Sequence, residues 1–159
     1  MSLTTFKPGV LALDAYAAAD FPAIADLWVA AWKTAGLAID FDARREWLKR
    51  HLRTLAAHGV RIIVARDSDG QTLGFVSIDP QNGYLDQLCV APSAFGAGVA
   101  PVLLREAMRL SPGVVELDVN EANARAVGFY TREGFRAVTR GLSAGSGLPT
   151  IRMRWDAAS

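Results

Sequence analysis

The chain of 159 residues is 51% hydrophobic and 21% charged, which predicts one globular domain over residues 1–159 and excludes a disordered chain. Its formal net charge is +1 and its arginines are scattered, so we expect no nucleic-acid partner. No apolar run approaches the ~20 residues of a membrane helix, and residues 1–9 lack the apolar core of a signal peptide, so we expect no membrane partner. The single cysteine, Cys89, excludes an internal disulfide and makes the cytoplasm the expected location.

The first part of the chain predicts a short strand and two amphipathic helices. The strand is the apolar run Val10–Leu13. Asp20 and Asp42 each precede a helical pattern and can cap the helix that follows, and the second helix should end at Gly59. The apolar residues at helical spacing are Ile24, Leu27, Trp28 and Ala31 in the first helix and Trp47, Leu48, Leu52 and Leu55 in the second.

His51 and His58 lie seven residues apart on the second predicted helix. No further ligand residues with metal-site spacing accompany them, so we interpret both as surface residues and predict no metal site.

Three strands joined by tight turns follow the second helix. They are predicted at Val60–Arg66, Thr72–Asp79 and Tyr84–Val90, with turns at residues 67–70 and 80–83. Such short turns favour an antiparallel meander.

The residues after Val90 predict a turn that can bind an anion. Gly96 and Gly98 precede a helical pattern from Val99 to Leu110. The unpaired N–H groups and the dipole at the start of a helix attract phosphate, and glycines let a ligand approach the backbone closely. A plain strand-to-helix turn is the alternative interpretation. No lysine follows Gly98 as in nucleotide-binding loops, and Pro101 replaces the third glycine of a dinucleotide fingerprint.

The last part of the chain predicts three more strands and one helix. Val114–Val119 should lie parallel to the Tyr84 strand, because a helix connects the two, and parallel neighbours form a crevice at their carboxyl ends. Asn120 or Asn123 can cap the helix that follows. Residues 136–140 and 150–155 predict a terminal hairpin whose Gly/Ser-rich loop, residues 141–147, is a candidate lid.

Two of these segments resemble the GNAT acetyltransferases. The segment FGAGVA is similar to the family's acetyl-CoA loop, Gln/Arg-x-x-Gly-x-Gly/Ala, with Phe95, Gly98 and Ala100 at the named positions and Phe95 in place of Gln or Arg. The segment of residues 118–135 resembles the pattern N-x-x-A-x-x-[FL]-Y-x-x-x-G-F. The matching residues there are Asn123, Ala126, Phe129, Tyr130, Gly134 and Phe135.

The resemblance implies a mixed α/β fold with a mostly antiparallel, twisted sheet of six to seven strands and helices on both faces. It implies direct transfer of an acetyl group from acetyl-CoA to a primary amine of a small molecule or peptide, without a metal, and it leaves a homodimer open. Pantetheine would bind the open backbone edge of the Tyr84 strand. The cofactor-binding residues that it implies are Leu88, Cys89, Val90, Phe95, Gly96, Ala97, Gly98, Val99, Ala100, Asn123, Ala126 and Tyr130.

The same resemblance assigns the proton donor to the leaving thiolate to Tyr130, since a hydroxyl with a pKa of about 10 can protonate a thiolate. It also places Asp118 at the position where related N-terminal acetyltransferases have a glutamate that acts as the general base, so it implies that Asp118 is the base. A backbone N–H at a bulge around Val90 could polarise the thioester carbonyl. Asp86, Glu116 or a water relay are the alternatives for the base.

Two rival hypotheses and the acceptor site complete the prediction. Cys89 as a nucleophile is disfavoured, because no histidine lies near it in the sequence and small strand cysteines are usually buried and inert. A non-catalytic acyl-CoA-binding or regulatory module is the alternative function. Trp32, Phe41 and Tyr84 are candidates to line the acceptor site, and Trp28 is a further candidate for which we expect core packing instead.

Overall fold

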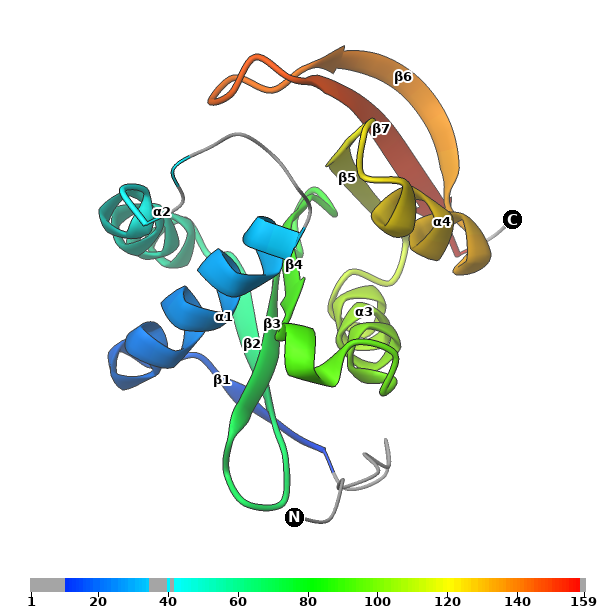
Figure 1. Ribbon diagram of the computed structural model, residues 1–159. Coiled ribbons are helices and arrows are strands. Elements are labelled where there is room, and N and C mark those ends of the chain that lie inside the picture. The colour runs from blue at the N-terminus through cyan, green and yellow to red at the C-terminus, as the bar shows by residue number, and fades with distance from the viewer. Residues whose placement is uncertain (1–10, 35–39, 41, 158–159) are drawn as a thin grey trace.

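Two antiparallel sheets meet along one edge in the computed structural model, which describes residues 11–34, 40 and 42–157 (Figure 1). The strands of the first sheet, in the order β1-β2-β3-β4, are β1 (Ala12–Ala15), β2 (Arg61–Arg66), β3 (Thr72–Ile78) and β4 (Leu85–Val90). The strands of the second sheet, in the order β5-β7-β6, are β5 (Val114–Asn120), β7 (Pro149–Asp156) and β6 (Arg136–Leu142). The predicted meander and terminal hairpin are confirmed. Val10, where the first strand was predicted to begin, lies outside the described residues.

Helices cover both faces of the first sheet, as predicted. Figure 1 shows α1 and α2 on one side of this sheet and α3 on the other, while α4 lies against the second sheet. The helices are α1 (Phe21–Thr34), α2 (Arg45–Ala57), α3 (Val99–Leu110) and α4 (Ala124–Arg132).

Two of the predicted helix caps are wrong, and one is confirmed. Asp20 lies in a short 3-10 helix before α1, where its carboxylate accepts the Ala17 N–H and pairs with Arg66 at 2.7 Å. Asp42 pairs instead with Lys33 at 3.0 Å. In both cases the carboxylate pairs with a cation and not with a backbone N–H of the helix that follows. Asn123 caps α4, since its side chain accepts the Ala126 N–H at 3.2 Å.

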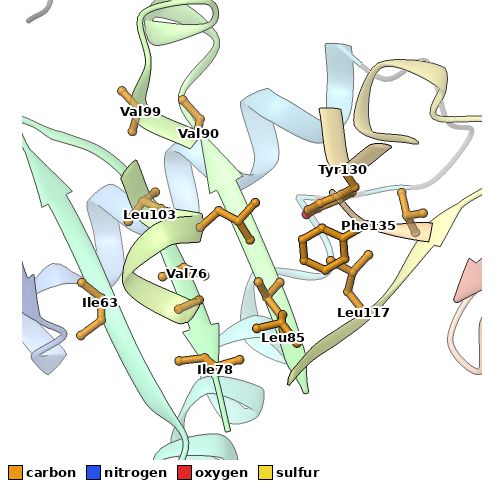
Figure 2. Packing of buried hydrophobic residues seen from close by; sticks show 14 of the residues in the cluster. Ile63, Val76, Ile78, Leu85, Val90, Val99, Leu103, Leu117, Tyr130 and Phe135 are labelled. Carbon is orange, nitrogen blue, oxygen red and sulfur yellow. The ribbon is translucent and has the colours of Figure 1, made fainter. Parts of the chain in front are cut away.

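Strand alternation divides the apolar residues of the first sheet between two clusters. Ile62 and Val64 of β2 face α1 and α2, whereas Ile63 and Ala65 face α3. The cluster that faces α3 continues across β5 to α4, and Figure 2 shows the part of it around Leu103. Both faces of β2 and β3 are therefore buried, which explains why these two strands read as nearly continuous apolar runs and not as alternating ones.

The two sheets are joined at the start of β4 and β5. Tyr84 and Glu116 form one parallel bridge, and the Glu116 N–H donates to the Gly83 carbonyl at 2.8 Å. Among the described residues, no further pairing links the two strands. The predicted parallel direction is therefore confirmed, and the two strands separate toward their carboxyl ends. Tyr130 and Phe135 lie between them (Figure 2).

A β-bulge interrupts the pairing of β4 with β3 at Asp86. Ile78 pairs with Leu85 and Ser77 pairs with Gln87, so Asp86 is the extra residue. The pairing is regular at Val90, where the bulge was predicted, and that prediction is wrong. Bulges redirect the side chain that they carry, and they are frequent beside active sites.

Gly74 of β3 should be intolerant of a side chain. A Cβ there would lie 2.6 Å from the Cys89 carbonyl oxygen and 3.1 Å from Leu103. We expect Gly74→Ala to lower the free energy of unfolding by about 1–3 kcal/mol. The measurement is urea denaturation. Gly113→Ala is the matched control, because nothing lies within 4 Å of its Cβ position, and it should change stability by no more than about 0.5 kcal/mol. Equal effects of the two substitutions would contradict the packing argument.

Candidate active site

Two cavities meet where β4 and β5 separate. The first, of about 820 Å³, lies between the end of β4, the glycine loop and α4. The second, of about 590 Å³, lies between β4, β5 and the β6–β7 hairpin. The residues that line both cavities are Trp32, Leu88, Asn123, Ala126 and Tyr130. A group bound in one cavity can therefore reach a group bound in the other only past these side chains.

The glycine loop forms a backbone cradle at the start of α3. Gly96 and Gly98 have φ angles of +77° and +87°, which favour glycine, and nothing lies within 4 Å of a Cβ position on Gly96. No side chain caps α3, so the N–H groups of Val99 and Ala100 lack a capping side-chain acceptor. Pro101 removes one further donor from this turn. The residues present fit an anionic group such as a pyrophosphate.

The edge of β4 that faces β5 carries backbone groups that no strand pairs within residues 11–34, 40 and 42–157. The Ala91 N–H donates to the Leu73 carbonyl of β3, and antiparallel pairing alternates from there. The N–H and C=O groups of Leu88 and Val90 consequently point away from β3, toward the space between the sheets. Those of Cys89 face β3, so the predicted open edge consists of Leu88 and Val90 alone.

Most of the predicted cofactor-binding residues line the first cavity. These are Leu88, Cys89, Val90, Phe95, Gly96, Gly98, Val99, Ala100, Asn123, Ala126 and Tyr130. Ala97 is not among the lining residues, and its N–H donates to the Ala94 carbonyl within the turn at 3.1 Å.

Tyr130 stands at the junction of the two cavities. Its ring packs edge-on against Phe129 and Phe135, with centroids 5.2 Å and 5.4 Å away, and Figure 2 shows it reaching from α4 toward β4. Only 7% of the residue is exposed. Burial raises the pKa of its hydroxyl well above the ordinary value, and the nearby Cys89 adds to the rise. Tyr130 therefore keeps its proton at neutral pH.

Asp118, the predicted base, is held by strong partners at the wall of the second cavity. Arg152 donates to both of its carboxylate oxygens, at 3.1 Å and 2.8 Å, and the Tyr84 hydroxyl donates at 2.8 Å. The Arg152 hydrogen bonds are the largest cause that lowers the pKa of Asp118. A lowered pKa makes the carboxylate a weaker base. Glu116, an alternative, pairs with Arg154 at 3.5 Å and does not line either cavity.

Asp86, the other alternative, lines the second cavity and contacts a histidine. His51 Nε2 lies 2.6 Å from Asp86 Oδ2. The expectation that His51 is a surface residue is wrong, since only 24% of its side chain is exposed. No sequence signal indicated this pair, because α2 and β4 meet only through the tertiary fold. His58 is exposed, as predicted.

Arg125 is a second residue that the sequence did not single out. Its guanidinium lies 3.8 Å above the centroid of the Phe95 ring, and both residues line the first cavity. A cation thus stands beside the position where the family pattern has Gln or Arg. A basic residue in the first turn of α4, next to the Asn123 cap, is the signal that could have drawn attention to it.

The predicted acceptor-site aromatics divide between cavity and core. Trp32 and Tyr84 line the second cavity. Trp28 is 4% exposed, and its Nε1 donates to the Gln87 side chain at 3.2 Å, so it belongs to the core. Phe41 lies outside the described residues. The predicted lid contributes residues 141–144 to the second cavity, and its mobility stays a prediction.

Cys89 has the surroundings of an unreactive thiol. It is 7% exposed, and burial raises its pKa to about 12. The thiolate that a nucleophile needs is therefore scarce at neutral pH. Within the described part of the chain, no group of three His, Cys, Asp or Glu side chains is arranged to hold a metal ion, and none of the helices is long and apolar enough to cross a membrane.

Comparison with known proteins agrees with this geometry. A family model described as an acetyltransferase (GNAT) domain matches residues 41–157. The peptidyl-lysine N-acetyltransferase YjaB of Escherichia coli strain K12 is 33% identical over 106 residues, which are 62% of this chain and 70% of YjaB. The solution structure of apo-form YjaB has a TM-score of 0.74, with 24% identity over 92% of this chain and 97% of that chain.

A structure with a bound cofactor shares the fold. The PaiA N-acetyltransferase of Thermoplasma acidophilum in complex with coenzyme A has a TM-score of 0.74, with 18% identity over 92% of this chain and 98% of that chain. The chain described here belongs to the GNAT acetyltransferase family. It is an acetyl-CoA-dependent N-acetyltransferase.

Replacing Asp118 should change stability in a pH-dependent way. Because the native pKa is lowered, the carboxylate stabilises the folded chain above its ordinary pKa of about 4, and this stabilisation is lost as the pH falls through the lowered native value. We expect Asp118→Asn to lower the free energy of unfolding at pH 7, and the variant and the wild type to converge as the pH falls below about 4. Denaturation with urea across this range measures the effect.

Asp26→Asn is the control for that measurement. Asp26 pairs with Arg45 at 2.9 Å, but 74% of its side chain is exposed. Such surface pairs contribute about 0–1 kcal/mol, so little change is expected at any pH. A difference between Asp118→Asn and the wild type that stayed constant with pH would contradict the role of the charge.

Proposed function

We propose that this acetyltransferase acetylates the side-chain amine of lysine in a peptide or protein. The observation that carries the proposal is the junction of the two cavities at Tyr130, with the carboxylates of Asp86 and Asp118 in the wall of the second cavity. An ammonium group on a long apolar stem suits a cavity that has acidic side chains beside Trp32 and Tyr84. The relative YjaB is a peptidyl-lysine N-acetyltransferase, which supports the same acceptor class.

The first cavity would hold acetyl-CoA, which supplies the acetyl group as a thioester. The N–H groups of Val99 and Ala100 would bind its pyrophosphate, and the backbone edge of Leu88 and Val90 would bind the pantetheine amides as an added strand does. Tyr130 would then stand beside the thioester.

Three proton movements accompany the transfer, and one proton is released overall. A lysine amine has a pKa of about 10.4, so it arrives protonated and must lose one proton before it attacks. The nitrogen loses a second proton as the amide forms, and the departing thiolate takes up one. Because the pKa of Tyr130 is raised, its hydroxyl stabilises the thiolate by donating a hydrogen bond and keeps its own proton. The hydrogen bonds from Arg152 and Tyr84 make Asp118 a weak base.

The proposed location is the cytoplasm, where the unpaired Cys89 thiol would stay reduced.

The acceptor class and the role of Tyr130 can be tested in one assay. We expect the wild type to release CoA from acetyl-CoA when given a lysine peptide with a blocked N-terminus, and not when the lysine is already acetylated. Tyr130→Phe should lower kcat about 100-fold, because removing one hydrogen-bond donor to the charge that develops in the transition state costs about 10²–10³ in kcat. Thiol release and mass spectrometry of the peptide report the result.

Affinity for acetyl-CoA is the control in that assay. Calorimetry should give the same Kd within about twofold for Tyr130→Phe, since the hydroxyl acts only on the reacting group. Binding of acetyl-CoA without release of CoA with any amine would favour the non-catalytic module. An unchanged kcat in Tyr130→Phe would refute its assigned role.

Arg125 would supply the positive charge that the glycine loop lacks. The Phe95 ring holds its guanidinium at the wall of the first cavity, where it can pair with a phosphate group of the cofactor.

We expect Arg125→Gln to weaken CoA binding about tenfold, because one charge-assisted bond is lost. Calorimetry with CoA measures this, and pantetheine, which has no phosphate, should bind both proteins equally. Arg105→Gln, at an exposed position of α3 outside both cavities, is the matched control. An equal loss of affinity for pantetheine would contradict the phosphate contact.

A further inference from the structure

Asp86 reaches the second cavity because of the bulge in β4. It has no partner residue on β3, and the Gln87 N–H donates to the Ser77 hydroxyl instead of a regular ladder carbonyl. The bulge turns the Asp86 side chain toward α2, where it meets His51, while the residue still lines the second cavity. Its carboxylate is 22% exposed, so it lies at the cavity wall and not in bulk solvent.

His51 is held rigidly in its contact with Asp86. Its ring stacks on Trp47 of the same helix, with centroids 4.5 Å apart and planes 13° from parallel. Trp47 stacks in turn on Trp28, at 6.4 Å. Trp28 donates to the Gln87 side chain, whose amide donates to Asp86 at 3.3 Å. Three elements, α1, α2 and β4, thus fix the geometry of one carboxylate, which is more support than a surface ion pair has.

The two acidic residues of the second cavity differ in what holds them. Asp118 accepts from Arg152 and Tyr84, and an arginine stays charged at every physiological pH, so a proton on Asp118 would break strong bonds. Asp86 has an imidazole as its principal partner. An imidazole can lose a proton from one ring nitrogen as it gains one on the other, so this pair can pass a proton on.

We propose that Asp86 is the base that takes the proton from the acceptor ammonium, and that His51 positions Asp86 and carries the proton to solvent. This rests on the proposed function. The N–H bond of the ammonium breaks, and the proton goes to Asp86. His51 takes part as the tautomer with its proton on Nδ1, so Nε2 accepts the proton from Asp86 and Nδ1 releases its own. His51 is partly exposed, so solvent can receive that proton. Asp86 is then ionised again and His51 is neutral with its proton on Nε2, and proton exchange with solvent restores the first tautomer. The neutral amine is free to attack.

Several other charged groups face this pair and set its surroundings. The charged groups are Asp118 on β5, Arg140 on β6, Arg152 on β7, and Arg44, which lies over the Trp47 ring, and the neutral Tyr84 directly precedes β4. None of them bonds to Asp86 or His51 among the described contacts.

The test compares kcat for Asp86→Asn and Asp118→Asn over pH 7–9. We expect Asp86→Asn to lose about 100-fold in kcat at pH 7. Its rate should then rise about tenfold per pH unit, because the fraction of neutral lysine amine rises by that factor below its pKa of about 10.4. Asp118→Asn should keep the pH profile of the wild type. A loss in Asp86→Asn that stayed the same at every pH would mean a structural role and overturn the proposal, as would an unchanged kcat.

His51→Gln and His58→Gln form the second comparison. Glutamine can still donate to Asp86 but cannot carry a proton, so His51→Gln should lower kcat about tenfold with an unchanged Kd for acetyl-CoA. His58 directly follows the same helix, and among the described contacts its ring bonds only to the Thr54 carbonyl, at 2.7 Å, so His58→Gln should match the wild type. Equal rates for the two variants would remove His51 from the mechanism.

The ratio of each variant's kcat to the wild-type kcat is also measured with a polyamine and with a peptide that carries a free N-terminal amine. Turnover of these amines but not of the lysine peptide by the wild type would refute the proposed acceptor class. The base would still be decided, because the Asp86→Asn ratio is obtained for every amine that is turned over. The melting temperature of each variant in the presence of acetyl-CoA confirms that it is folded.

Discussion

The separation of β4 from β5 is the constraint on which the rest of this molecule depends. One bridge between Tyr84 and Glu116 ties the strands at one end, and aromatic side chains from α4 and its C-terminal side keep them apart beyond it. The separation leaves a strand edge without a partner in the described structure, which a globular protein usually covers. Here the open edge forms one wall of the first cavity, and in the proposed function it would bind the extended pantetheine arm.

The same separation brings two carboxylates to one cavity and gives them different chemistry. Asp118 sits between an arginine and a tyrosine, and these partners favour its charged form. Asp86 lies on a bulge and contacts the imidazole of His51, which stacks on the Trp47 ring. A carboxylate that is held by a permanent cation is suited to fixing the wall of a site. One that is held by a titratable ring is suited to exchanging protons. Environment, and not residue type, separates the two roles.

On the proposed cofactor side of the site, a departure from the family pattern lies next to a cation from elsewhere in the chain. Phe95 stands where the pattern has a polar or basic residue, but its ring provides a face for the guanidinium of Arg125 from α4. The charge thus comes from a different element, about thirty residues along the chain. The residues of the glycine loop alone therefore do not reveal the cation that lies beside it. The guanidinium carries the positive charge, and the aromatic ring restricts the rotamers of the long, flexible arginine side chain.

The sequence by itself determined the meander, the glycine loop, the capped α4 helix and the family, because each depends on local spacing. Turn residues, positive φ at Gly98 and the Asn123 cap act within a few residues of one another. Only the tertiary structure decided which charges meet. It gave Asp20 and Asp42 to cations instead of helix caps, and it paired His51 with Asp86 across 35 positions of the chain. The physical reason is that periodicity reports which face of an element is apolar, whereas an ion pair or a bulge depends on the register between elements that the sequence does not reveal.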